Sequence, residues 1–225
     1  MTRKACPDDA RPLIQVRRCE ALGEFSPSEL GRLCRRFRKR HWVRLPNFLE
    51  PYLLEMVSGR LVGARFRDYQ PSSNHRRQVL VDSDLDRLLM LLLNDGNLFD
   101  FVRSIAEPSL PIRCFTGRIF RQPPGGNYHL SWHPDTTDGK LVSLTVNLSP
   151  APYQGGLLEI KDVSRGAILA EIDNTGFGDA ILFRASEDQV HRSTIVEGEH
   201  SKLTFSGWFR SVTLRDAAAA EYDDK

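Results

Sequence analysis

The sequence predicts an α+β protein in which a helical N-terminal half, residues 25–110, packs against an antiparallel β-sandwich or jelly roll formed by residues 111–214. Apolar residues recur at helical spacing in several segments of residues 25–110. After Pro111 the chain changes to short β-rich runs separated by Gly, Pro, Asn and Asp. Helices followed by a series of strands are typical of this class, and a chain of 225 residues can bury a core of its own.

The helical half opens with a clear start signal. Ser26-Pro27-Ser28-Glu29 has the S-x-x-E form of a capping box, with Pro at the first helical position. The elements expected after this helix are a short strand over His41 to Leu45, a helix from Glu50 to about Leu61, a helix over Asp84 to Leu93 that Ser83 can cap, and a shorter helix over Leu98 to Ile105.

The second half is expected to consist of strands. Each β-rich run is short and is bounded by turn-forming residues, as in a sandwich or barrel. In chain order the runs are IRCFTGRIFRQ, KLVSLTVNLS, GGLLEIKD, AILAEID, DAILFRA, RSTIV and KLTFSGWFR.

Both ends of the chain are expected to lie outside this body. Residues 1–24 show no clean periodicity and are interpreted as an N-terminal arm. Residues 215–225 form a polar, acidic tail. A single domain over residues 25–214 remains between them.

Charge and composition exclude several function classes. Lys and Arg number 31 against 29 Asp and Glu, a formal net charge of +2, so the basic excess of a nucleic-acid binder is missing. No run of 18 apolar residues occurs, and no apolar run follows the first positive charges, so neither a membrane span nor a secretory signal is predicted. We therefore expect a cytoplasmic protein whose partner binds at a specific site.

A candidate metal site follows from two parts of the second half. His133 and Asp135 lie where a strand enters a loop, and residues i and i+2 of extended chain point to the same side. His191 follows just beyond the strand-like run DAILF. Two imidazoles and one carboxylate form the facial triad that holds non-heme Fe(II) and leaves positions open for other ligands.

The other histidines point to no second metal site. His129 lies four residues before His133, but no Glu stands between them as in the H-E-x-x-H zinc motif, and the context is not helical. Surface or hydrogen-bonded positions are expected for the remaining histidines, and we expect Trp208 to pack in the core.

With these motifs in place, the sequence resembles the Fe(II)- and 2-oxoglutarate-dependent dioxygenases, with the prolyl 4-hydroxylase-like branch nearest. The resemblance covers roughly Arg113 to Arg210 and rests on an ordered series of segments. The segments are NYHLSWHPDTTDGKLVSLTVNLSP with its H-x-D, QGGLLEI with a glycine pair before a strand, GDAILFRASEDQVHRSTIVEG with the distal His, and KLTFSGWF as the closing strand. It implies a double-stranded β-helix, the cupin-like form of the jelly roll.

The resemblance also implies roles for individual residues. His133, Asp135 and His191 would be both the metal ligands and the catalytic centre. Lys202, eleven residues after the distal His, would pair with the far carboxylate of 2-oxoglutarate, and Thr204 would add a hydroxyl from the same face of the strand. Tyr128 is the nearest phenol to the place where several relatives carry a Tyr that binds the cosubstrate.

The implied reaction is hydroxylation coupled to decarboxylation of 2-oxoglutarate, with release of succinate and CO2. Its cofactors would be Fe(II), 2-oxoglutarate and O2, with ascorbate as a candidate reductant. Halogenating relatives carry a small residue at the position of Asp135, so the carboxylate favours hydroxylation. The substrate class stays open among protein side chains, amino acids and small metabolites, and residues 65–78 are a candidate lid over it.

Two alternatives stay open. The protein could be a catalytically inactive β-helix that serves as a scaffold or binding protein. It could also be a cupin-type metal enzyme that does not use 2-oxoglutarate. Cupins usually present two close histidines, a Glu and a later His, whereas here the second ligand of the close pair is Asp135.

Overall fold

The computed structural model describes residues 12–73, 75–82, 84–126, 128–173 and 175–217. In these residues the helices are α1 (Pro27–Arg40), α2 (Pro51–Leu61), α3 (Asp84–Leu93) and α4 (Gly96–Ala106). The strands are β1 (Ile14–Val16), β2 (Ala21–Gly23), β3 (Trp42–Leu45), β4 (Phe66–Ser72), β5 (His75–Leu80), β6 (Cys114–Gln122), β7 (His129–His133), β8 (Lys140–Asn147), β9 (Gln154–Gly155), β10 (Leu158–Asp162), β11 (Ile168–Ile172), β12 (Ala180–Arg184), β13 (Gln189–Ser193), β14 (Val196–Glu197) and β15 (Lys202–Arg210).

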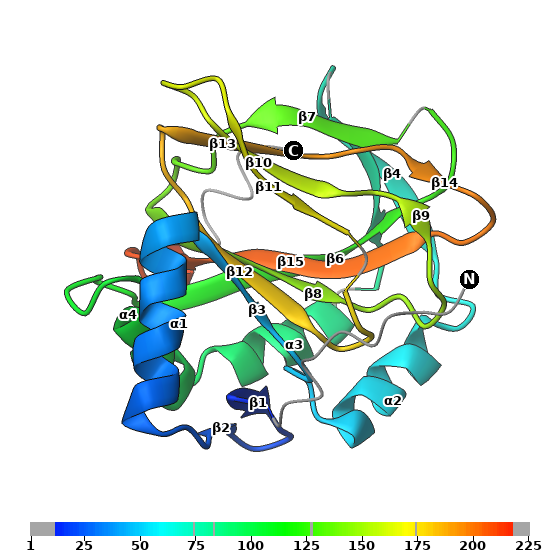
Figure 1. Ribbon diagram of the computed structural model, residues 1–225. Coiled ribbons are helices and arrows are strands. Elements are labelled where there is room, and N and C mark those ends of the chain that lie inside the picture. The colour runs from blue at the N-terminus through cyan, green and yellow to red at the C-terminus, as the bar shows by residue number, and fades with distance from the viewer. Residues whose placement is uncertain (1–11, 74, 83, 127, 174, 218–225) are drawn as a thin grey trace, which may run out of the picture.

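One curled antiparallel sheet dominates the molecule. Its strands lie in the order β11, β10, β13, β7, β5, β6, β15, β8, β12, β3, and β4 pairs with β5. In Figure 1 the part from β11 to β7 forms an upper leaf, and the part from β6 to β3 forms a lower leaf. Strand β5 joins the leaves because it pairs with both β6 and β7. The predicted double-stranded β-helix is confirmed.

The two faces of the lower leaf have different partners. On β15, Phe205 and Phe209 are buried in the main apolar core, which they share with residues of all four helices. Thr204, Ser206 and Trp208 alternate with them and line a pocket between the leaves. Because side chains of a strand alternate between faces, the apolar face of β15 is covered by the helices that lie below the sheet in Figure 1, and its polar face is left for a site.

The helices begin at, or within two residues of, their predicted starts. The Ser26 hydroxyl accepts from the Glu29 amide at 3.3 Å and the Glu29 carboxylate accepts from the Ser26 amide at 2.7 Å, so the capping box of α1 is present. The helices expected at 50–61 and 84–93 match α2 and α3. The helix expected from Leu98 begins two residues earlier, after the Asp95 N-cap, whose side chain accepts from the Leu98 amide. The Ser83 cap lies outside the described residues.

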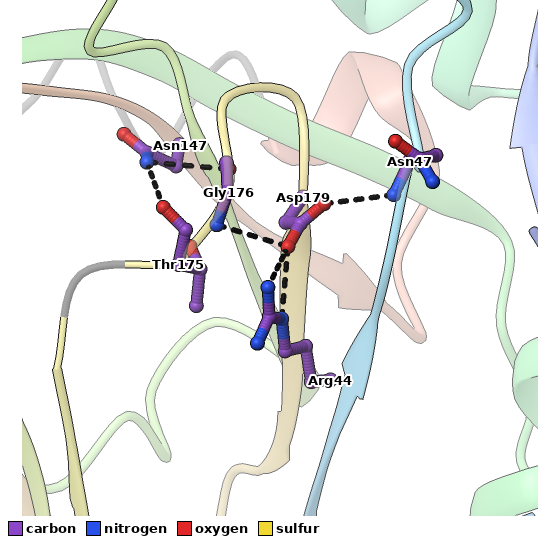
Figure 2. A network of polar contacts seen from close by, with 6 residues as sticks. All are labelled: Arg44, Asn47, Asn147, Thr175, Gly176 and Asp179. Atoms are coloured by element: carbon purple, nitrogen blue, oxygen red, sulfur yellow. Dashed lines mark hydrogen bonds and ion pairs between the residues drawn. The ribbon is translucent and has the colours of Figure 1, made fainter. Parts of the chain in front are cut away.

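A polar network fastens the helical half to the sheet (Figure 2). Asp179 accepts from the Arg44 guanidinium at 2.8 and 2.5 Å, from the Asn47 amide at 2.8 Å and from the Gly176 amide at 3.0 Å. Asn147 donates to the Thr175 carbonyl at 2.7 Å. These contacts join β3 to the start of β12 and fix the turn before it.

Part of the expected N-terminal arm belongs to the body. Strands β1 and β2 form a small hairpin, and Ile14, Val16 and Ala21 are buried in the main core. The backbone of Val16 also exchanges hydrogen bonds with Phe48 and Glu50. The segment looked irregular because its strands have three residues each, too few to show a period. Residues 1–11 of the arm and 218–225 of the tail lie outside the described chain.

Two further segments differ from expectation. Residues 65–78, expected as a lid, lie largely in the hairpin β4–β5, which is continuous with the main sheet. The run RSTIV was expected to be a strand of its own, but β13 begins earlier, at Gln189, and so includes His191. Among the described residues, no helix is both long and apolar enough to cross a membrane.

Candidate active site

The pocket between the leaves holds the three predicted ligands. His133 ends β7, Asp135 lies in the loop after it, and His191 lies in β13. Strands β7 and β13 pair with His133 opposite His191, so the ladder brings together residues far apart in the sequence. One ligand atom from each of the three side chains lies within 4.8 Å of the others. His133 Nε2 is 3.8 Å from Asp135 Oδ1, and His191 Nε2 is 3.4 Å from Oδ2.

Burial keeps both imidazoles neutral. Desolvation, together with His191 nearby, lowers the pKa of His133 to about 4, and desolvation also lowers the pKa of His191. Burial opposes ionisation of Asp135, but His191, the Trp208 indole and His133 outweigh it, so the pKa of that carboxyl lies below its usual value. Two neutral imidazoles and one carboxylate are the protonation states that a divalent metal requires of its ligands.

Neighbouring groups fix the ligand orientations. His133 Nδ1 lies 2.7 Å from the Ser131 carbonyl, so Nδ1–H donates there and Nε2 keeps its lone pair for a metal. The His75 ring packs against His133 with centroids 4.5 Å apart. The Phe183 ring lies edge-on to His191 at 4.9 Å. Both imidazoles are therefore held before any metal binds.

Two donors hold the carboxylate. The Ser143 hydroxyl donates to Asp135 Oδ2 at 3.0 Å, and the Trp208 indole N–H donates to the same oxygen at 2.6 Å. The prediction that Trp208 is a core residue was therefore wrong. Its position on β15 places it on the pocket face, because Phe209 next to it takes the core face.

Lys202 and Thr204 also line this pocket. Lys202 Nζ donates to the Gly156 carbonyl at 2.6 Å and to the Ser193 hydroxyl at 3.1 Å. Burial, and the charge of Arg77, lower the pKa of Lys202 to about 8. A desolvated ammonium whose own partners are neutral is suited to an anionic ligand, so the residues present fit both a divalent metal and a dicarboxylate.

The structure does not bring Tyr128 into this group. Its hydroxyl donates to Asp68 at 3.1 Å and accepts from Gln78 at 3.3 Å, and it is absent from the described residues that line the pocket. Its backbone carbonyl accepts from Gln122, which lines the pocket in its place. The buried phenol near Lys202 is that of Tyr153, whose ring centroid lies 5.8 Å from Nζ.

Sequence reasoning missed several residues of the pocket. Ser143 could have been found from the alternation of β8, since it shares a face with Thr145. Arg77 carried no such signal, because it lies in a segment expected to be a lid.

Comparison with known proteins supports the same class. A family model described as the 2OG-Fe(II) oxygenase superfamily matches residues 118–210, which include all three candidate ligands, Lys202 and Thr204. No curated protein matches the chain.

Solved structures resemble this one over most of their length. A 2OG-Fe(II) oxygenase family oxidoreductase from Burkholderia pseudomallei superposes with a TM-score of 0.64 and 13% identity, over 84% of this chain and 94% of its own. A Pseudomonas putida prolyl-4-hydroxylase superposes with a TM-score of 0.61 and 16% identity, over 81% of this chain and 99% of its own. A prolyl hydroxylase from Trichoplax adhaerens, in complex with a hypoxia inducible factor peptide fragment, superposes with a TM-score of 0.60 and 15% identity. The superposition covers 87% of this chain and 97% of the hydroxylase.

A double-stranded β-helix with a His, Asp, His cluster between its leaves defines the class of non-heme metal oxygenases. Within that class, the family model resembles the chain over residues 118–210, and this match together with the structural neighbours, two of them prolyl hydroxylases, supports an enzyme of the 2OG-Fe(II) oxygenase superfamily. The family implies Fe(II), 2-oxoglutarate and O2 as cofactors.

Proposed function

We propose that this protein is a hydroxylase in which His133, Asp135 and His191 hold Fe(II). The observation that carries the proposal is the pairing of His133 with His191 across β7 and β13, in the same pocket as the half-buried Lys202. The ligand set leaves metal positions open, as an oxygenase requires. Bound iron and 2-oxoglutarate would supply the oxidant for a substrate C–H bond, with succinate and CO2 as co-products.

The remaining residues of the pocket prepare the site. Lys202 and Thr204 would receive the far carboxylate of 2-oxoglutarate, because both project from one face of β15 into the pocket. Ser143 and Trp208 hold Asp135 in place, which limits reorganisation when the metal binds. The Phe120, Leu130 and Phe183 side chains supply apolar walls that reduce the water around the reacting groups.

An anaerobic titration tests the proposal. Apoprotein receives Fe(II) and then 2-oxoglutarate while the weak visible charge-transfer band of a metal-chelated keto acid is followed. We expect the band in the wild type and its loss in Asp135→Ala. Asp188→Ala, an exposed carboxylate close to the distal His in sequence, serves as the matched control and should keep the band.

The other outcomes separate the alternatives. Iron binding without the band would favour a cupin-type enzyme that does not use 2-oxoglutarate. Failure to bind iron would favour the inactive scaffold. Once the band is seen, succinate release measured against candidate small molecules and peptides identifies the substrate, and repeating it without ascorbate tests whether that reductant is required. We further propose a cytoplasmic location, in keeping with the sequence.

A further inference from the structure

A second cation lies in the pocket beside Lys202. Arg77 is in β5, the strand that joins the two leaves, and it lines the same pocket as the candidate metal ligands. Its guanidinium carbon lies 3.3 Å from the centroid of the Phe120 ring and 5.8 Å from that of Tyr69. Stacking on an aromatic face leaves the N–H groups at the edge of a guanidinium free to bind.

Arg77 differs from the basic residues around it. Arg76, its neighbour in β5, forms an ion pair with Asp68 at 2.6 Å. Arg192 pairs with Glu159, and Arg121 donates to Gln78 at 2.8 Å. Within the described residues, the Arg77 guanidinium has neither a hydrogen bond nor an ion pair with protein. Burial lowers its pKa to about 10, so it is charged at neutral pH.

Among the described residues of the pocket, Arg77 is the cation that lacks an anionic partner. Asp135 is the carboxylate that lines the pocket, and it faces both imidazoles and accepts from Ser143 and Trp208. Asp173 lies with Lys202 in the adjoining pocket, where its charge acts on that ammonium. 2-Oxoglutarate held by a metal and Lys202 would leave the charge of Arg77 unmatched. A desolvated charge without a partner is costly.

We propose that Arg77 binds a carboxylate of the substrate, and that the substrate is a small molecule carrying a free carboxyl group. This inference rests on the proposed function, since the metal and Lys202 then account for both carboxylates of 2-oxoglutarate. A guanidinium fork binds a carboxylate through two parallel hydrogen bonds.

The position of Arg77 suits this role. His75, two residues earlier and so on the same side of β5, packs against the ligand His133. A carboxylate on Arg77 would therefore hold the rest of a small substrate next to the metal. The strand order places β6 between β5 and β15, so Arg77 and Lys202 approach the pocket from different strands.

The experiment measures binding, independent of turnover. Wild-type protein is loaded anaerobically with Fe(II) and 2-oxoglutarate, and the charge-transfer band is recorded first. Its thermal unfolding is then followed with the twenty common L-amino acids and with acetate, butyrate and benzoate, each beside its amide. Hits are titrated to obtain a Kd. The variants are Arg77→Gln, Arg77→Lys, Lys202→Met and, as the matched control on the same strand, Arg76→Gln.

We expect at least one acid to raise the melting temperature while its amide does not. Arg77→Gln should raise the Kd for that acid by about tenfold or more, because a charge-assisted pair is lost. The Kd of Arg77→Lys should lie between those of Arg77→Gln and wild type, because lysine keeps the positive charge but cannot form two parallel hydrogen bonds. Arg76→Gln should leave the Kd unchanged. Circular dichroism checks that each variant folds, and Arg77→Lys keeps the test valid should Arg77→Gln fail to fold.

Several results would overturn the inference. Equal binding of acid and amide, equal binding by wild type and Arg77→Gln, or no stabilisation by any acid would each contradict it. Loss of 2-oxoglutarate binding in Arg77→Gln as severe as in Lys202→Met would show that Arg77 holds the cosubstrate instead. Absence of the band in the wild type would be a failure of the proposed function, which is seen before any acid is added.

Discussion

Binding of 2-oxoglutarate should weaken as pH rises through about 8, because Lys202 loses its proton there. Burial and the charge of Arg77 lower the pKa of the ammonium, while Asp173 opposes them. Only the protonated form can pair with a carboxylate, so the favourable state exists below this pKa and is lost above it. The carboxylates of the cosubstrate, with ordinary pKa values near about 4, stay ionised throughout.

The size of the effect follows from the protonated fraction. With a pKa of about 8, Lys202 is about nine-tenths protonated at pH 7 and about one-tenth protonated at pH 9. If the anion binds the ammonium form alone, the apparent Kd rises about tenfold over this interval, equivalent to about 1.4 kcal/mol of binding free energy.

Anaerobic calorimetry of Fe(II)-loaded protein at pH 7, 8 and 9 and constant ionic strength measures this profile. Lys202→Arg is the control, because a guanidinium remains charged over the whole range. The Kd of Lys202→Arg for 2-oxoglutarate should not change between pH 7 and 9, whereas that of the wild type should rise. A wild-type profile without pH dependence, or one that Lys202→Arg reproduces, would refute the assignment. Arg77→Gln should move the wild-type midpoint to higher pH, since one cation near Lys202 is gone.

Three other changes test the site and the fold. Trp208→Phe removes the 2.6 Å hydrogen bond to Asp135 and should weaken Fe(II) binding by about tenfold or more, as measured by equilibrium dialysis. An unchanged affinity for Fe(II) would show that Trp208 does not hold Asp135 in place for the metal. Asp179→Ala strands the Arg44 guanidinium and two backbone amides, which should cost about 3 kcal/mol and lower the melting temperature by about 6–12 °C in calorimetry. Asp188→Ala, at an exposed site, should leave the melting temperature unchanged. Ser26→Ala removes the N-cap of α1 and should cost about 1 kcal/mol, or about 2–4 °C; no shift would mean that the cap contributes nothing to global stability.

Features that depend on local chemistry could be predicted from the sequence. The capping box at Ser26 fixed the start of α1, because an N-cap needs residues within one turn. The run KLTFSGWFR coincides with β15, and its alternation places Lys202 and Thr204 on one face. The H-x-D at His133 and Asp135 named two of the three candidate ligands.

Which partner each face of a strand meets depends on how distant strands and helices pack together. Pairing of β7 with β13 brought His191 opposite His133, an alignment set by the register of two strands that are separated in the sequence by β8 to β12. Whether Trp208 faced core or pocket depended on the helices that cover the other side of β15. Tyr128 turned to Asp68, and Arg77 turned inward, because β5 inserts between β6 and β7. Such choices are made between strands far apart in the sequence, where local propensity carries no information.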